Sequence, residues 1–309
     1  MKKEKFKTSV GGQALIEGIM MRGPRQVCTA VRRPDGGIET KLDPVTTFSW
    51  QKIPLVRGVL SMIESLIVGY RCLMYSAEIS MGEEAFEAEE SKLDKWINEH
   101  LGEKAQNFVM SLAAVLGGML ALVLFMVLPT TIVGLLGKVL PLEGVRALLE
   151  GVLKIAIFIG YLALVRNMKD IKRMFRYHGA EHKTIACYEA GEELTVENIR
   201  RHSRFHPRCG TSFLVLVILI SILVSSLLPW SSTGLRIVLK LLTLPVVMGI
   251  SYELIKLAGR YDNILTRIIS APGLWIQRLT TSEPDDSMIE VAIAAVKPVL
   301  PENWEDSLW

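Results

Sequence analysis

Two long stretches of this 309-residue sequence contain no charged residue at all. They are residues 108–137 and 211–235, and each exceeds the roughly 20 apolar residues that cross a bilayer core of about 30 Å. Half of all residues are hydrophobic and the mean hydropathy is +0.33, which is unusual for a soluble protein of this size. A soluble core explains such runs poorly, so we predict that both cross a membrane.

Two further segments, residues 147–165 and 237–258, have few charges. Their charged residues are Glu150, Lys154, Lys240, Glu253 and Lys256. Charges near the ends of a span can reach the interface along their own alkyl stems. Burial in a soluble core would be a tolerable alternative here. We nevertheless predict an α-helical integral membrane protein with about four transmembrane helices.

The sequence is also poor in cysteine and lacks the pattern of a cleaved signal peptide. Its four cysteines are scattered without the spacing of a disulfide framework, which indicates thiols kept reduced on the cytoplasmic side. The lysine-rich N-terminus is followed by no continuous apolar stretch or small-residue cleavage site. We therefore expect a multi-pass protein of the cytoplasmic membrane.

Basic residues are concentrated between the second and third predicted spans, in residues 167–212, and are few in the connections 138–146 and 230–236. Lysine and arginine accumulate in cytoplasmic loops. We expect this loop and both termini in the cytoplasm. The expected partners are the lipid bilayer, its anionic headgroups, and a membrane protein or a second copy of this chain, with no nucleic acid.

Changes in composition divide the chain into six segments. They are a β-rich cytoplasmic N-terminal element (1–55), an amphipathic interfacial helix with an acidic linker (56–107), a first transmembrane pair (108–166), a cytoplasmic His-rich loop (167–212), a second transmembrane pair (213–258), and an interfacial helix with a soluble tail (259–309). Arg57, Glu64 and Arg71 recur every seven residues within 55–81 and so share one face. This pattern favours a helix lying in the interface over a fifth crossing.

Residues 26–31 and 38–42 are β-prone runs joined by the turn sequence Arg33-Pro34-Asp35-Gly36-Gly37. The preceding stretch, residues 11–23, is bracketed by glycines and mostly apolar. It also holds three polar residues, Gln13, Glu17 and Arg22. It is either a buried strand with a turn at each end or a loop that carries these groups to a functional site, and the sequence supports both equally.

Local signals also predict helices elsewhere. The second span is expected to continue as a helix through Tyr188, because residues 167–188 contain no proline, and Gly191 is expected to end it. Thr195 can cap a short helix over 196–201. Near the C-terminus we expect two more elements. They are a surface-lying segment 264–279, broken at Pro272-Gly273 with Trp275 at the headgroups, and a helix 289–296 stopped by Pro298.

Four of the five histidines lie within residues 178–206. His178, Glu181 and His182 form the sequence H-G-A-E-H, and the i, i+4 spacing places both imidazoles on one helical face, with Glu181 nearly on it. His202, His206 and Cys209 follow. Imidazole, carboxylate and thiolate groups are ligands of divalent metals such as zinc. This window is therefore the candidate metal site.

The order H-x-x-E-H occurs in inverzincin metalloproteases, where the histidines bind zinc and the glutamate is the general base. We predict His178 and His182 as metal ligands and Glu181 as the catalytic base. His202, His206 or Cys209 would complete the ligand set, and Glu253 could serve by spacing. The alternatives are a structural metal, since closed four-ligand sites are structural, and a polar helical face with unbound histidines.

Six arginines accompany these motifs: Arg22, Arg176, Arg200, Arg201, Arg204 and Arg208. Contact with anionic headgroups explains most of them, at about 1 kcal/mol per basic residue near the surface. A site for an anionic or phosphorylated ligand is the sharper interpretation, and it keeps Arg22, Arg204 and Arg208 among the candidate site residues.

Several long motifs together resemble the YqhQ family of bacterial membrane proteins, a domain-of-unknown-function family described as predicted metal-dependent enzymes. The motifs are Gly11 to Gly23, Val56-Arg57-Gly58, Tyr177 to Lys183, and Arg201 to Phe213. The resemblance extends from the N-terminus through the C-terminal tail. It implies a membrane protein with a metal site at the positions already named, and it supplies no reaction.

Our leading hypothesis is a metal-dependent hydrolase whose His/Glu metal site lies at the cytoplasmic face of the membrane. The alternative is a non-catalytic membrane assembly or regulatory factor whose central loop is held by a structural metal or by polar contacts. A transporter ranks third, because the longest apolar run, residues 108–137, lacks the ionisable residues expected along a transport pathway.

Overall fold

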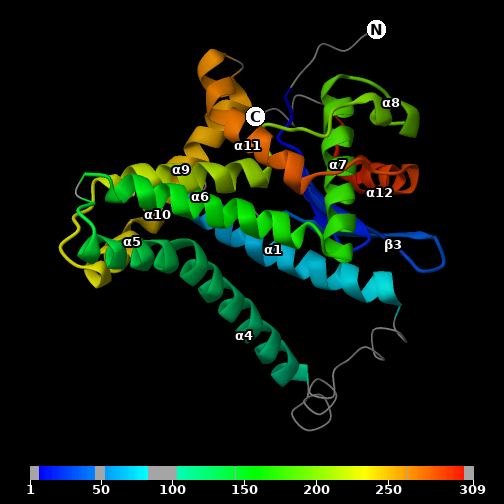
Figure 1. Cartoon of the computed structure of the whole chain (residues 1–309). Helices are drawn as coiled ribbons and strands as arrows, with labels where there is room; N and C mark the ends of the chain where they lie inside the picture. The colour runs from blue at the N-terminus through cyan, green and yellow to red at the C-terminus, as the bar shows by residue number, and fades with distance from the viewer. Residues whose placement is uncertain (1–6, 46–52, 83–102, 143, 262, 303–309) are drawn as a thin grey trace. The chain divides into compact units, whose positions relative to one another are not determined.

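The computed structural model describes residues 7–45, 53–82, 103–142, 144–261 and 263–302. These residues are mostly helical and contain one small sheet (Figure 1). The chain divides into two compact units. Unit 1 comprises residues 1–82, 162–217 and 248–309, and unit 2 comprises residues 83–161 and 218–247. The acidic stretch 83–94, which we predicted to be a linker, lies outside the described residues.

The N-terminal element is a four-stranded antiparallel sheet in which each strand pairs with the next in sequence. Its strands are β1 (Gly11–Leu15), β2 (Gly18–Arg22), β3 (Gln26–Arg32) and β4 (Ile38–Pro44). The predicted hairpin of β3 and β4 is confirmed. Residues 11–23 form a hairpin as well, because Leu15 pairs with Gly18 across a two-residue connection. This segment is therefore two strands, where we had considered one strand or a loop.

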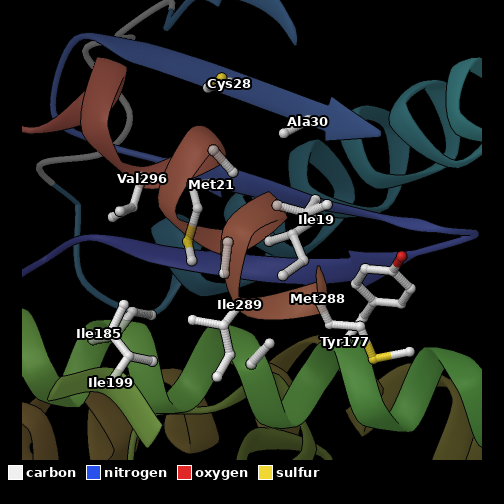
Figure 2. Close-up of a cluster of buried hydrophobic side chains, with 14 of the residues drawn as sticks. Ile19, Met21, Cys28, Ala30, Tyr177, Ile185, Ile199, Met288, Ile289 and Val296 are labelled. Atoms are coloured by element: carbon white, nitrogen blue, oxygen red, sulfur yellow. The ribbon is translucent and has the colours of Figure 1, made fainter. Parts of the chain in front are cut away.

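Both faces of the sheet are covered within unit 1. Successive residues of a strand point to opposite faces. Ile19 and Met21 of β2 join a core with α7 (Lys169–Glu189) and α12 (Asp286–Val296), as Figure 2 shows. Met20 faces the other way and packs with Cys72 of α1 (Val56–Met81). Burial on both faces explains why β2 is apolar along most of its length instead of alternating.

The predicted C-terminal helix is confirmed as α12, which is followed by the 3-10 turn η3 (Lys297–Val299) containing Pro298. The sequence did not predict where this helix packs. Met288, Val291 and Ala292 are fully buried in the core of unit 1. Burial of a side chain the size of valine or methionine contributes about 1.5–3 kcal/mol, so α12 is an integral part of this fold.

The helix predicted to run from the second span through Tyr188 is interrupted. α6 (Arg146–Val165) ends three residues before α7, and Met168 has extended backbone angles. Asn167 donates its side-chain amide to the carbonyl of Ala163, and this bond competes with continued helix. The C-terminal end is as predicted, because Gly191 follows α7 in a left-handed conformation with φ of 69°. Thr195 caps α8 (Val196–Arg201) through the amide of Asn198, also as predicted.

The segment after the fourth predicted span is one continuous helix, α11 (Ile264–Thr280), so the break expected at Pro272-Gly273 was wrong. A capping box between Asn263 and Thr266 stabilises its start. Gly273 packs closely against Ser212, where a side chain on residue 273 would collide. The glycine thus serves close packing between α11 and α9 (Gly210–Ser226) and does not end the helix.

Within the described part of the chain, four helices are long and apolar enough to cross a membrane: Val56–Met81, Val115–Val139, Arg146–Val165 and Thr233–Arg260 (α10). Val115–Val139 joins the end of α4 (Glu103–Leu122) to the π-helix η2 (Val123–Val127) and α5 (Leu128–Val139). The number agrees with our prediction, but the members differ. α9 has 17 residues, and Pro229 lies just after its end. α1 meets the same length and composition criteria, although we predicted it to be interfacial.

Unit 2 buries charged side chains, and three of them, Glu150, Lys154 and Lys240, were expected to reach the membrane interface. Glu150 and Lys154 of α6 are 2% and 5% exposed, and Arg236 and Lys240 of α10 are 0% and 4% exposed. Each pair has i, i+4 spacing and so shares one helical face. These residues therefore face the interior of unit 2 and do not snorkel.

Candidate metal centre

Three of the predicted ligands converge within unit 1. His178 and His182 lie one turn apart on α7, and Cys209 lies in the turn that precedes α9. One potential ligand atom from each residue lies within 4.8 Å of the others, and the two imidazole rings are 4.3 Å apart. His178 Nε2 is 3.1 Å from Cys209 Sγ. These three side chains form the group that could hold a divalent cation.

Backbone carbonyls orient both imidazoles. His178 Nδ1 is 2.8 Å from the carbonyl oxygen of Thr280, and His182 Nδ1 is 2.6 Å from that of Arg204. A carbonyl can only accept, so each Nδ1 carries the proton and each neutral ring keeps its lone pair on Nε2. Among the described residues, the buried Nε2 of His182 has no hydrogen-bond partner. Histidine ligands of metals characteristically donate their second ring nitrogen in this way.

The electrostatics of the cluster favour a thiolate. Burial raises the pKa of Cys209, but the attraction of His178 and His182 outweighs it and holds that pKa well below its usual value. Burial also lowers the pKa of His178, while the neighbouring Cys209 raises it to about 9. A positive charge beside the sulfur is therefore favourable. A divalent cation would supply that charge in place of the imidazolium proton.

Glu181 lies beside these donors and is 4% exposed. Its Oε1 accepts a hydrogen bond of 3.0 Å from the amide of Gly12, and its Oε2 is 4.0 Å from His178 Nε2. Burial raises the pKa of Glu181 above its usual value, which strengthens it as a proton acceptor. Gly12 is required here because a Cβ would lie 2.4 Å from the Met20 carbonyl and 3.1 Å from Glu181.

His206 lies next to the three donors but has other partners. Its ring is 5.6 Å from that of His182, and its Nε2 is 3.7 Å from Glu189 and 3.1 Å from Arg208. Arg208 also forms an ion pair with Glu189. Burial lowers the pKa of His206. Its contacts place it beside the candidate ligand group as part of a supporting ion-pair network.

The remaining predicted site residues lie elsewhere. His202 contacts Glu192, and Glu253 on α10 forms an ion pair with Arg57 of α1. In the N-terminal hairpin, Gln13 packs against Gly69 of α1. Glu17 binds Arg173 and Tyr177, and Arg22 forms an ion pair with Glu64. The group around His178 therefore receives a backbone amide from this hairpin, while the three polar side chains have structural partners.

All six arginines associated with the motifs contact carboxylates within unit 1. The pairs are Arg22–Glu64, Arg176–Asp285, Arg200–Asp286, Arg201–Glu197, Arg204–Glu283 and Arg208–Glu189. Every one of these arginines therefore takes part in an intramolecular ion pair, and contact with anionic headgroups stays a prediction. Four of the six pairs could not be predicted from the sequence, because the partners lie more than 40 positions apart.

Close packing explains why H-G-A-E-H has a glycine, Gly179, at its second position despite the cost of about 1 kcal/mol to a helix. A Cβ at this position would lie 2.0 Å from the carbonyl oxygen of Ser282. The backbone that follows α11 therefore passes directly over α7. This approach also positions Thr280, whose carbonyl orients His178.

Comparison with known proteins identifies the family. Residues 53–302 match the family described as "Protein of unknown function (DUF1385)", and the chain belongs to this family. It is 33% identical over 309 residues to a protein of Bacillus subtilis (strain 168) described as "Uncharacterized protein YqhQ", covering 97% of this chain and 95% of that protein. The resemblance inferred from the motifs is thus confirmed. No solved structure matches the chain.

Proposed function

We propose that this protein is a membrane-embedded metal-dependent hydrolase. His178, His182 and Cys209 hold a divalent metal, most simply zinc, and Glu181 is the general base. The observation that carries the proposal is the arrangement of the two histidines. Both donate Nδ1–H to backbone carbonyls, and the buried Nε2 of His182 has no protein partner among the described residues.

The donor set favours a catalytic metal over a structural one. Catalytic zinc sites have three protein ligands and one open position, whereas structural sites are closed by four. Zinc in such a site lowers the pKa of water to about 7. Glu181 would accept the proton that this water releases, since its carboxylate lies beside His178 and its pKa is raised by burial.

Metal analysis of the full-length protein in detergent, combined with hydrolysis of a chromogenic ester such as p-nitrophenyl acetate, tests this proposal. Glu181→Gln should keep the metal but lower the metal-dependent rate by about 10²–10⁴-fold, because glutamine cannot accept the proton. His182→Ala should lose the metal of this site. Glu17→Gln is the matched control, because Glu17 is a carboxylate of the same unit that contacts Arg173 and Tyr177. It should change neither quantity.

Burial of the cluster favours one alternative, a non-catalytic assembly or regulatory factor with a structural metal. His182 and Glu181 are 1% and 4% exposed, which leaves a narrow approach for a substrate. Under this alternative, Glu181→Gln would leave function intact and ligand variants would mainly lower protein abundance. If neither His178→Ala nor His182→Ala changes metal content, the metal proposal itself fails.

The proposed orientation places the loop 167–212 and both termini in the cytoplasm, with α1 lying in the interface. α1 contacts the sheet through Arg22–Glu64, and its first turn contacts α10 through Arg57–Glu253. Cysteines introduced at Gly144 and Ser232 should react with an external impermeant reagent, and one at Ser203 should not. A reporter fused after Met81 should read as cytoplasmic. External labelling at position 203 would overturn the orientation, and an external signal after Met81 would make α1 a span.

A further inference from the structure

His202 was predicted to complete the ligand set of His178 and His182. It belongs instead to a second group of potential ligands. Cys187, Glu192 and His202 each offer one donor atom, and the three atoms lie within 4.8 Å of one another. Cys187 is in the last turn of α7, and His202 is the residue that ends α8. Gly191, in its left-handed conformation, turns the chain between Cys187 and Glu192.

The geometry of this group suits a tetrahedral metal. Zinc–nitrogen and zinc–oxygen bonds of about 2.0–2.2 Å at a tetrahedral angle separate the two ligand atoms by about 3.3 Å. His202 Nε2 and Glu192 Oε2 are 3.2 Å apart. The Cys187 sulfur makes a long contact of 3.6 Å with the Glu193 carbonyl. The thiol is fully buried, whereas the side chains of His202 and Glu192 are 19% and 49% exposed, so a cation could enter from their side.

We propose that Cys187, Glu192 and His202 form a second divalent metal site, separate from the group at His178. The mixture of thiolate, imidazole and carboxylate selects a borderline cation such as zinc. The metal would connect the end of α7 to the end of α8. Arg204 follows two residues later, and its carbonyl orients His182. The second site would therefore fix the segment that positions the first.

Cobalt titration of the metal-stripped, full-length protein in detergent tests this inference. The wild type should bind two equivalents, each producing a thiolate-to-cobalt absorption band. Glu192→Gln should weaken one of the two equivalents by about tenfold or more, the range for perturbing a metal site through one partner. Glu193→Gln is the matched control, because this adjacent carboxylate is also exposed to solvent and lies outside the group.

The outcomes distinguish this site from the proposed catalytic one. His178→Ala should remove the other equivalent and leave the one that depends on Glu192. A wild type that binds a single equivalent, lost only in His178→Ala, would overturn the second site and leave the proposed function standing. Equal binding by Glu192→Gln and Glu193→Gln would also overturn it. Because Glu192 is exposed, its substitution does not threaten folding.

Discussion

The two units both bury ionisable side chains, but they use them differently. In unit 1, the groups around His178 are held by backbone atoms of Thr280, Arg204 and Gly12, which leaves ligand atoms facing one another. In unit 2, most buried charges are matched by other side chains or by helix carbonyls. The comparison indicates that unit 1 keeps side-chain atoms available to bind a metal ion, whereas unit 2 uses its polar groups to join its helices.

Unit 2 illustrates this through one carboxylate. Glu150 accepts hydrogen bonds from Thr130 at 2.7 Å and from Arg236 at 3.1 Å, and it also forms an ion pair with Lys240. Arg236 further donates to the carbonyl of Ser225 at 2.8 Å, at the end of α9. Lys154 differs, because it contacts the Ser221 hydroxyl at 2.9 Å and has no carboxylate partner among the described residues. Glu150 is thus the residue on which the cluster depends.

The largest effect is expected when Glu150 is neutralised. Glu150→Gln leaves Arg236 and Lys240 buried without their carboxylate, and breaking a buried pair costs about 3–5 kcal/mol. The thermal unfolding temperature in detergent should fall sharply, as should protein abundance. Lys154→Met is the matched control and should be neutral or stabilising, since it removes a buried cation that lacks a carboxylate. A greater loss from Lys154→Met than from Glu150→Gln would contradict this account of unit 2.

Metal removal should affect unit 1 next most strongly. A cation at 100 times its dissociation constant stabilises the folded state by about 2.7 kcal/mol, and a chelator removes that contribution. The unfolding temperature of the wild type should therefore fall on chelation. Chelation should affect a variant that combines His182→Ala with Glu192→Gln much less. Equal chelator sensitivity of the two proteins would show that the metal binds elsewhere.

Gly179→Ala should have an intermediate effect. Alanine favours a helix by about 1 kcal/mol over glycine, but the Cβ would collide with the Ser282 carbonyl, and overpacking costs about 1–3 kcal/mol. We expect net destabilisation in a denaturation curve, together with weaker metal binding. Gly160→Ala on α6 is the control, because nothing lies within 4 Å of a Cβ there. Stabilisation by Gly179→Ala would mean that the backbone does not pass this closely.

The smallest effect is expected at the surface of unit 1. Arg200 and Asp286 form an ion pair in which both side chains are more than half exposed. Exposed pairs contribute about 0–1 kcal/mol. Asp286→Asn should therefore change the free energy of unfolding by less than about 1 kcal/mol and leave metal content unchanged. A loss comparable to that of Glu150→Gln would remove the distinction between buried and exposed charges on which the comparison rests.

Features encoded locally could be predicted from the sequence. The β3–β4 hairpin follows from its turn residues, α8 follows from the Thr195 cap, and the end of α7 follows from Gly191. The proximity of His178 to His182 follows from helical periodicity alone. Each of these inferences depends on residues within a few positions of one another.

Features that depend on distant segments could not be predicted. To predict that His202 lies apart from His178, one must know how α8 packs. To predict that α12 is buried, one must know that the sheet covers it. The Thr280 carbonyl that orients His178 lies 102 positions away. Because every residue has a backbone carbonyl, the residue type at position 280 does not indicate that its carbonyl accepts a hydrogen bond from His178. Glu150, Lys154 and Lys240 were expected to snorkel because charges near the ends of apolar segments can reach the interface. Instead, they lie on helical faces that point to the interior of unit 2.

X-ray absorption at the zinc edge of the Cys187→Ala protein tests the central claim most directly, because this variant removes the sulfur of the proposed second site. The account predicts one sulfur at about 2.3 Å, from Cys209, and a shell of nitrogen or oxygen ligands at about 2.0 Å. His178 and His182 would contribute two of these, and Cys209→Ser should remove the sulfur. A zinc shell without sulfur, or a sulfur signal that persists in Cys209→Ser, would contradict the account.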